Sequence, residues 1–433
     1  MIAMTPKWVP WPGDGQIDVR PISPIVDDKY FRRLSDKKQL GFSYLVFPGA
    51  TYDRRRHAMG TFIKTREFVS RMVKQGFLTE NQAVNLSLFG LLHDIGHGPF
   101  SHVIEAFTRT KHEQYGLIIL ERMAEAIAAC GGDSELIKAY MSGKDPAGII
   151  VMDKNLGMDK LDYLVRDQEA IEFGPNVRCC VESVLNHLVY KDGEIMVDLK
   201  ALDAAMEIQR AYTYFYRNVH LGKSSYLIQR FMQKLMFQLL NTPKEDGGIT
   251  EEELWEMVDG DLIHALKRCK NKTVASGMKI FDRGVKHFPK TALSIRLQGY
   301  EWLERQSGKP IYVIGARKEF FERFFERSKA GDLEQVEARI AEAIGVESWE
   351  VAISHIVEKG RFIPRDIRVF NGPQVYSLKE RDPRYFDLLG EELDKYLCVR
   401  VCVVPEHRQI LFEKWRIALE IICNYMMYES FIL

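Results

Sequence analysis

The sequence predicts a mainly α-helical protein with a smaller mixed α/β region toward its C-terminal end. Between residues 27 and 241, apolar residues recur three or four positions apart, which is the spacing of amphipathic helices. After the segment NTPKEDGGIT (241–250), β-branched runs alternate with helical segments, as in KPIYVIGA (309–316), VAISHI (351–356) and YLCVRVCVV (396–404). We therefore expect an irregular lead-in, a helical domain and a mixed region that serves regulation or assembly, over residues 1–26, 27–241 and 245–433.

Charge and composition exclude some classes of partner. The 433 residues carry 60 Lys and Arg against 60 Asp and Glu, so the formal net charge is zero. A protein that binds long nucleic acid needs a surplus of cations to displace counterions from the phosphates, and this chain has none overall. The same balance argues against a polybasic membrane anchor. With 46% hydrophobic and 28% charged residues, the chain has the composition of a soluble globular protein.

The sequence also indicates where the protein works. It contains no uninterrupted apolar run of about 18 residues, the length needed to span a bilayer. Its first residues lack the charged start and apolar stretch of a secretory signal. The seven cysteines are odd in number and form no C-x-x-C pair, which favours reduced, packed thiols over disulfides. We expect a cytoplasmic protein without a membrane segment.

The first distinctive segment is TENQAVNLSLFGLLHDIGHGPFSHVIEAF (79–107). Thr79 and Gln82 form a capping-box start, and the stretch that follows is apolar almost all round, so it predicts a deeply buried helix. This helix ends in His93 and Asp94. Burying an imidazole beside a carboxylate costs several kcal/mol unless each is paired or bound to a cation. Glycines and a proline follow, which lets His97 and His102 turn into the same cavity.

Further ligand candidates lie on either side of this segment. His57 precedes an amphipathic helix, and in MDKLDYLVRD (158–167) the residues Asp159, Tyr163 and Asp167 are four apart and share one helix face. Each piece alone has an ordinary interpretation, such as a solvated helix face or, for His112, a surface histidine. Together they supply two imidazoles and two carboxylates, from His57, His93, Asp94 and Asp159. This set suits iron, manganese, zinc, nickel or magnesium and leaves positions for water and substrate.

Four segments carry a resemblance to a known family: FRRLSDKKQLGFSYLVFPGATYDRRRHAMG (31–60), LLHDIGHGPFSH (91–102), KHEQYG (111–116) and MDKLDYLVRD (158–167). They resemble the HD-domain phosphohydrolases and, among these, the deoxynucleoside triphosphate (dNTP) triphosphohydrolases. The resemblance covers roughly residues 25–225. It implies an HD-domain helical core, a homo-oligomer and one divalent metal whose ligands match His57, His93, Asp94 and Asp159.

The resemblance also implies roles for other residues. Arg54 and Lys160 match groups that hold the triphosphate, and cationic, donor-rich side chains suit that task. Three residues match catalytic histidines beside the α-phosphate: His97, His102 and His112. The remaining matches contact the nucleoside and its deoxyribose: Gln39, Leu40, Tyr163 and Asp167.

The segment YFYRNVHLGKSS (214–225) departs from the family pattern. Lys223 is retained and, with His220, is an expected substrate contact facing the sugar and base. His220 takes the place of an aromatic residue, and Gly222 stands where histidine is usual. The arginine for the terminal phosphate could be Arg210 or Arg217. Where some members bind a guanine activator, Asp27 is present but Ser35 replaces an arginine, which places guanine activation of that type in doubt.

The reaction implied is metal-dependent hydrolysis at the α-phosphorus, which releases a deoxynucleoside and tripolyphosphate. His102, or as second choice His112, protonates the leaving oxygen, since a histidine can hold or release a proton at neutral pH. We expect Tyr163 to pack under C2′ and to reject ribonucleotides sterically. Two alternatives stay open: a nucleotidase or phosphodiesterase that uses the same metal, and a catalytically inactive nucleotide-sensing scaffold. A second nucleotide could also activate the enzyme.

Overall fold

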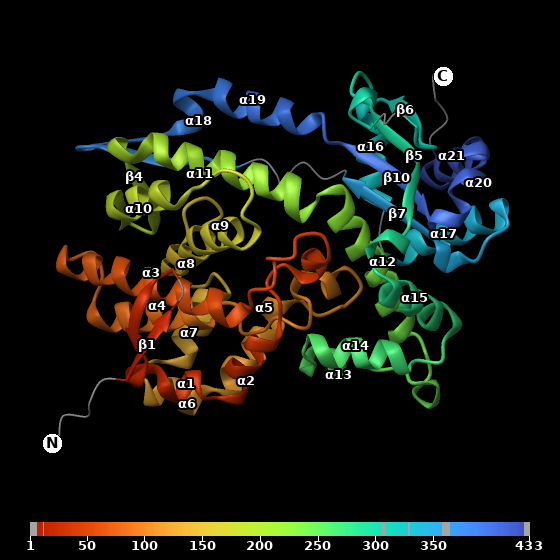
Figure 1. Ribbon diagram of the computed structural model, residues 1–433. Coiled ribbons are helices and arrows are strands. Elements are labelled where there is room, and N and C mark those ends of the chain that lie inside the picture. Colours follow the sequence, from red (N-terminus) through yellow and green to blue (C-terminus); the bar gives the residue numbers. More distant parts are fainter. Residues whose placement is uncertain (1–6, 12, 305–307, 328–329, 357–363, 428–433) are drawn as a thin grey trace.

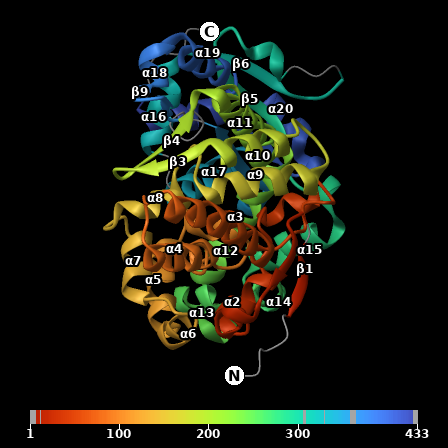
Figure 2. The same cartoon turned by 90° about the vertical axis from the view of Figure 1, so that its left-hand side faces the viewer.

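This computed structural model describes the chain except for residues 1–6, 12, 305–307, 328–329, 357–363 and 428–433. The fold is mainly helical with a smaller mixed α/β part, as predicted. Figure 2 shows the N-terminal helices, coloured red and orange, in the lower part with the N-terminus, and strands of the two four-stranded sheets in the upper part with the C-terminus. In the described part of the chain, no helix combines the length and apolar character that crossing a membrane requires. All seven cysteines are free.

The N-terminal half is a cluster of helices around one large apolar core. Three helices supply the site described below: α3 (Arg54–Lys74), α4 (Glu80–Leu92) and α9 (Met158–Ile171). The capping box at Thr79 and Gln82 forms as predicted, and α4 is almost entirely buried. The other helices of this half are α1 (Ser23–Val26), α2 (Lys29–Arg32), α5 (His112–Arg122), α6 (Ala124–Ala129), α7 (Ser134–Met141), α8 (Ile149–Met152), α10 (Arg178–His187), α11 (Leu202–Phe215) and α12 (Lys223–Leu240).

Part of the expected irregular lead-in is a β-hairpin. Strands β1 (Trp8–Trp11) and β2 (Gly15–Asp18) pair antiparallel, with Trp8 opposite Asp18. The prediction of irregular structure over 1–26 was wrong here because proline and glycine mark turns as well as loops. Gly13 takes a φ of 86° in the connecting turn, a conformation that glycine adopts without steric cost. The hairpin rests on α3, where the Trp11 Nε1 donates to the backbone oxygen of Arg56 at 3.3 Å.

A second sheet joins the two halves of the chain. Its strands are β3 (Leu188–Lys191), β4 (Glu194–Asp198), β8 (Arg368–Asn371) and β9 (Gln374–Ser377), in that order. Strand β4 runs parallel to β8, with Val197 opposite Val369. The helices α13 (Glu251–Glu256), α14 (Asp259–Arg268) and α15 (Lys272–Arg283) contribute to the same apolar core as α3 and α4. Packing is therefore continuous across the predicted boundary at 241–250.

The third sheet forms the C-terminal part (Figure 1), in the order β6 (Tyr312–Ala316), β5 (Lys290–Leu297), β10 (Cys398–Val403) and β7 (Val351–Ile356). The predicted strands at 309–316, 351–356 and 396–404 correspond to β6, β7 and β10. Strand β10 is buried throughout. This sheet shares one apolar core with α16 (Lys318–Arg327), α17 (Ala330–Ile344), α20 (Arg408–Glu413) and α21 (Trp415–Met426). The short α18 (Leu378–Arg381) and α19 (Pro383–Asp394) lie instead beside α11, where the Tyr385 hydroxyl donates to the Met206 carbonyl oxygen at 3.1 Å.

A half-buried carboxyl on α17 should make stability depend on pH. Burial raises the pKa of Glu334 to about 7, although it accepts a hydrogen bond from Gln238 at 2.7 Å. Because the folded-state pKa lies above the ordinary value of 4.5, the stability lost on ionisation accumulates as the pH rises from 4.5 through 7. We expect Glu334→Gln to raise the melting temperature by about 1–3 °C at pH 8, and by less at pH 5.

Calorimetry at the two pH values tests this. Glu342→Gln, an exposed change on the same helix, serves as the control and should alter neither melting temperature. An equal gain for Glu334→Gln at pH 5 and pH 8 would contradict the prediction.

Candidate metal centre and active site

The ends of three helices meet at one point in the N-terminal half. The Asp53 side chain caps α3 by accepting from the Arg56 backbone N–H at 2.8 Å, and His57 lies in the first turn that follows. His93 and Asp94 stand at the C-terminal end of α4, and Asp159 lies in the first turn of α9. His57 is fully buried. Helix ends suit such a site because side chains there can turn inward without crossing a neighbouring turn.

The four predicted metal ligands converge. His57 Nε2 lies 3.2 Å from His93 Nε2, 3.1 Å from Asp159 Oδ1 and 3.5 Å from Asp94 Oδ2. His93 Nε2 lies 3.6 Å both from Asp94 Oδ1 and from Asp159 Oδ1. His57, His93 and Asp94 have the spacing of a metal-binding group, and Asp159 faces them from the opposite helix. The structure thus brings together all four residues that the sequence singled out.

The hydrogen-bond partners of the two histidines show that a cation fits between them. His93 Nδ1 lies 2.9 Å from the Gly90 carbonyl oxygen, and His57 Nδ1 lies 2.8 Å from Asp162 Oδ2. Both partners only accept hydrogen bonds, so each Nδ1 carries a proton, and in the neutral imidazole that binds a metal each Nε2 keeps its lone pair. Two lone pairs and two carboxylates therefore point at one another. A divalent cation satisfies all four groups at once.

Electrostatics at this point also favour positive charge. Burial lowers the pKa of His57, but its contacts with Asp159 and Asp162 outweigh burial and raise that pKa to about 9. Burial also opposes protonation of His93, yet the neighbouring Asp94 and Asp159 carboxylates raise its pKa. The carboxylates hold a positive charge where the imidazoles meet, and a metal ion would meet the same demand.

Asp162 was missed by the sequence reasoning, although it lies inside the MDKLDYLVRD segment. Its side chain is fully buried and contacts His57 Nδ1, Lys64 Nζ at 2.7 Å and Arg166 Nε at 2.7 Å. Carboxylates that orient a metal-bound histidine recur in metalloproteins. Gly60 allows this close packing, since a Cβ there would lie 2.1 Å from Asp162 Oδ1. The available signal was the spacing of three residues from Asp159, which places both carboxylates on one side of a helix.

The three predicted catalytic histidines form a second group beside the first. The His97 ring stacks on that of His112, with centroids 4.0 Å apart, and lies 4.6 Å from that of His102. His97 Nε2 lies 3.2 Å from Asp94 Oδ1, so the two groups adjoin. His97 is buried, whereas the His102 side chain is 65% exposed. Of the three, His102 is the one most open to an incoming substrate.

Glu105 links these histidines and was also missed. Its Oε1 lies 3.0 Å from His102 Nδ1 and 2.7 Å from His112 Nδ1. Burial opposes its ionisation, but the hydrogen bonds to the two histidines hold the pKa of Glu105 far below its usual range. The spacing of three residues from His102 could have indicated this contact. With His97, these residues also have the spacing of a metal-binding group.

The turn that carries the histidines is held by contacts from other elements. Phe100 and Ser101 adopt φ values of 53° and 62°, which are unusual for residues other than glycine. Asp259 at the start of α14 accepts from the Phe100 N–H at 2.6 Å, and Lys37 donates to the His97 carbonyl oxygen at 2.5 Å. Backbone strain of this kind persists where the surroundings over-determine it, and it is frequent at functional sites.

The two predicted phosphate ligands lie at the edge of the cluster. Arg54 forms an ion pair with Asp94 and donates from Nε to the Ser101 hydroxyl at 2.7 Å. The Lys160 ammonium lies 3.5 Å from the centre of the Tyr212 ring, a cation–π contact. Burial lowers the pKa of Lys160 to about 8. Arg54 thus contacts one candidate ligand directly, and Lys160 follows another, Asp159, in the chain and interacts with its charge.

The predicted nucleoside contacts gather around Asp167. This carboxylate accepts from the Tyr52 hydroxyl and lies 3.2 Å from His220 Nε2. The Gln39 N–H donates to the Tyr52 carbonyl oxygen at 3.0 Å, and Leu40 packs in the same apolar cluster as Tyr52. The Tyr163 ring lies 6.3 Å from that of His57, which connects this group with the metal ligands.

Three other predicted cations contact other parts of the fold. Lys223 pairs with Glu304, whose other carboxylate oxygen lies 3.2 Å from Arg296 Nη1 in the C-terminal part. Arg217 lies over the Tyr396 ring at 4.4 Å, and Arg210 forms an exposed ion pair with Glu207. The structure does not bring these side chains into contact with the metal ligands. A π-helical turn over Tyr216–His220 changes the phase of this segment.

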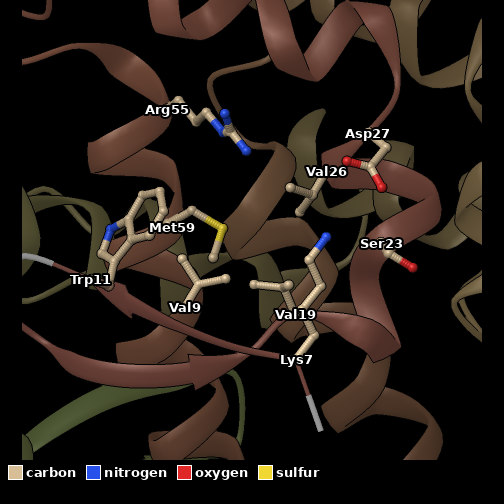
Figure 3. A pocket seen from close by; sticks show the side chains of 9 residues that line it. All are labelled: Lys7, Val9, Trp11, Val19, Ser23, Val26, Asp27, Arg55 and Met59. Carbon is tan, nitrogen blue, oxygen red and sulfur yellow. The ribbon is translucent and has the colours of Figure 1, made fainter. Parts of the chain in front are cut away.

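A pocket opens on another side of α3 (Figure 3). The hairpin lines it with Val9 and Trp11, and α3 lines it with Arg55 and Met59. Asp27, the residue matched to activator binding, also lies in its wall. Ser35 lies next to it, 3.5 Å from Arg55 Nη1. The pocket is therefore separate from the cluster around His57.

Comparison with known proteins agrees with this geometry. The family model of the HD domain matches residues 56–155. The chain contains an HD domain. The match covers His57, His93 and Asp94, whereas Asp159 lies just beyond it and is placed by the structure.

Several relatives resemble the HD-containing part of the chain. An HD domain-containing protein of Acanthamoeba polyphaga mimivirus is 33% identical over 181 residues, which is 35% of this chain and 40% of the relative. A deoxynucleoside triphosphate triphosphohydrolase homologue from Dictyostelium discoideum is 29% identical over 226 residues, 47% of this chain and 42% of that protein. The corresponding enzyme of Gallus gallus is 29% identical over 237 residues, 42% and 38% of the two chains. The chain thus spans about two fifths of these relatives.

A solved structure matches almost the whole fold. The crystal structure of a phosphohydrolase from Bacteroides thetaiotaomicron superposes with a TM-score of 0.69, covering 92% of this chain and 99% of that one. The sequences are 21% identical, so the likeness concerns the fold. It includes the C-terminal part as well as the HD domain.

Proposed function

We propose that this HD-domain protein is a phosphohydrolase that cleaves dNTPs at the α-phosphorus, releasing a deoxynucleoside and tripolyphosphate. The proposal rests on the contact between two groups of side chains. The first consists of the four proposed metal ligands, and the second of the three histidines beside Glu105. Asp94 and His97 join them at 3.2 Å. A phosphorus centre between the groups would have an electrophile on one side and proton donors on the other.

The proposed metal ligands are His57, His93, Asp94 and Asp159. A divalent cation bound there supplies Lewis-acid chemistry and lowers the pKa of bound water. Two imidazoles and two carboxylates are compatible with manganese, iron, magnesium, zinc or nickel. Asp162 and the Gly90 carbonyl oxygen orient the two imidazoles.

The remaining residues bind the substrate and move a proton. Arg54 and Lys160 neutralise charge that grows on the phosphate oxygens. His102 protonates the leaving 5′ oxygen of the nucleoside. Glu105 lies 3.0 Å from its Nδ1, which leaves Nε2 to deliver the proton. His112 is the second candidate, because it shares the same carboxylate.

Sugar recognition is proposed for the group around Asp167. Tyr163 packs under C2′, where a ribose hydroxyl would collide with the ring. Gln39 and Leu40 contact the nucleoside from the loop before α3, and His220 approaches the sugar through its contact with Asp167. Selectivity for deoxyribose follows, since a well-packed ring cannot yield to an added hydroxyl.

A second candidate function has its own support. Arg210 contacts Glu207 and Arg217 contacts Tyr396, and neither contact involves a proposed metal ligand. A nucleotidase that releases orthophosphate, or a phosphodiesterase, needs no arginine for a terminal phosphate. The catalytically inactive scaffold is less favoured because all four proposed ligands are present.

Product analysis separates these functions. The metal-loaded protein is incubated with a panel of dNTPs, NTPs and deoxynucleoside monophosphates, each with and without a second nucleotide, and the products are separated by ion-exchange chromatography. Tripolyphosphate from dNTPs alone supports the proposal. Orthophosphate from monophosphates supports the nucleotidase. Cleavage of bis(4-nitrophenyl) phosphate, included as a phosphodiester, supports the phosphodiesterase, and no hydrolysis of any substrate supports the scaffold.

Assembly, regulation and location are further proposals. We expect a cytoplasmic homo-oligomer, in which Lys223 and the C-terminal part contribute to coupling. The arm of the panel with mixed nucleotides tests activation, because coupling between two sites must change the velocity with one substrate when a second nucleotide binds. Sedimentation velocity tests the assembly state.

A further inference from the structure

The turn of the N-terminal hairpin reaches the carboxylate that orients a proposed metal ligand. Asp14 lies in this turn, next to Gly13. Its Oδ1 accepts from Lys64 Nζ on α3 at 3.2 Å, and its Oδ2 accepts from Arg166 Nη2 on α9. The Asp14 side chain is 11% exposed, so the contacts are mostly shielded from solvent. The hairpin therefore joins α3 to α9 through charge.

The same two cations also hold Asp162. Lys64 Nζ lies 2.7 Å from Asp162 Oδ1, and Arg166 Nε lies 2.7 Å from Asp162 Oδ2. Asp162 Oδ2 in turn lies 2.8 Å from His57 Nδ1. Two carboxylates thus share two cations, which balances the charges and leaves Asp162 able to accept from the imidazole. Removing one partner of a buried ion pair is unfavourable because it leaves the other charge buried without compensation.

We propose that Asp14 is a remote positioning residue for the metal centre, which orients His57 through Lys64, Arg166 and Asp162. The inference rests on the metal centre of the proposed function, but not on the proposed reaction. Without Asp14, both cations pair with Asp162 alone. That carboxylate then accepts more weakly from His57, and the surplus positive charge disfavours a bound dication.

The position of the hairpin depends on contacts outside this network. Trp11 donates to the Arg56 carbonyl oxygen, and Arg178 Nη1 donates to the Gly13 carbonyl oxygen at 3.2 Å. The first contact holds the hairpin on α3 and the second holds its turn on α10. The hairpin is therefore placed independently of Asp14, so removing this carboxyl group should leave its fold in place.

The test is Mn²⁺ binding to chelator-treated protein by isothermal titration calorimetry. We expect Asp14→Asn to bind Mn²⁺ about 10–100-fold more weakly than the wild type, the range found when outer residues of metal sites are changed. Asp18→Asn is the matched control. It lies on the same hairpin, where its carboxylate pairs with Arg20 away from the network, and it should bind Mn²⁺ within about twofold of the wild type.

A double-mutant cycle with Asp162→Asn tests the route. If Asp14 acts through Asp162, the losses in affinity of the two single variants should not add in the double variant. Additive losses, or wild-type affinity in Asp14→Asn, would overturn the inference. If Asp14→Asn fails to fold, Lys64→Met tests the same charge balance from α3. With one cation fewer, Asp162 accepts more strongly from His57, so Mn²⁺ should bind at least as tightly as to the wild type, and weaker binding would overturn the inference.

Other outcomes separate this inference from the proposed function. A wild-type protein that binds no Mn²⁺ would overturn the metal centre, and the inference with it. A wild-type protein that binds Mn²⁺ but releases no tripolyphosphate would overturn only the reaction.

Discussion

Replacing Asp94 by Asn should abolish metal binding and hydrolysis together. The Asp94 carboxylate faces both imidazoles and also pairs with Arg54, and asparagine keeps its size and its ability to accept from that arginine. Loss of the negative charge removes one of four proposed ligands and the Lewis-acid chemistry that they support. A metal contributes several kcal/mol to the transition state, so we expect kcat/KM to fall by at least about 10³-fold.

Two measurements check this prediction. Metal content is determined by mass spectrometry after dialysis, and activity is followed by tripolyphosphate release. Asp203→Asn, an exposed change on α11, should retain both. Circular dichroism establishes that each variant is folded. Full metal stoichiometry in folded Asp94→Asn would contradict the assignment of Asp94 as a ligand.

Replacing His102 should slow the reaction while leaving the metal in place. His102 is exposed, and its Nδ1 lies 3.0 Å from Glu105, which is not one of the proposed metal ligands. If it protonates the leaving oxygen, His102→Gln removes general acid catalysis, which is worth about 10²–10⁴-fold in rate. The loss should fall on kcat, with Mn²⁺ affinity unchanged.

The substrate offers a direct control for this role. A dNTP analogue with a leaving group of low pKa, such as a 4-nitrophenyl ester in place of the nucleoside, needs no proton, so His102→Gln should cleave it nearly as fast as the wild type. His264→Gln, an exposed histidine change on α14, should behave as the wild type with both substrates. An equal loss with both substrates would assign His102 to binding instead, and no loss would favour His112 as the acid.

Much of the local structure could be predicted from the sequence. The capping box at Thr79 and the three β-branched runs formed as expected, because these signals depend on residues close together in the chain. The pairing of β4 with β8 could not be predicted, since the strands lie far apart in the sequence and each is short. The hairpin at residues 8–18 was missed because its Pro and Gly content resembles that of a loop.

The candidate site shows the same division. The four proposed metal ligands were predicted, because two histidines and two acidic residues in suitable segments can be recognised from the sequence alone. Glu105 and Asp162 were missed, since a single acidic residue on a helix has many ordinary roles. The choice between Arg210 and Arg217 stayed open because the π-helical turn after α11 breaks the regular helical phase on which such an assignment depends.

The sequence by itself determined the types of ligand, their order along the chain and the HD-domain character, because local spacing decides which side chains share a helix face. Only the tertiary structure decided that Nε2 of His57 faces the cluster. Which nitrogen is free depends on the partner of the other, and Asp162 comes from a different helix. The tertiary structure also decided that Asp14, in a segment expected to be irregular, is linked to Asp162 through Lys64 and Arg166. Buried charges must be balanced in space, and the residues that balance them can come from any part of the chain.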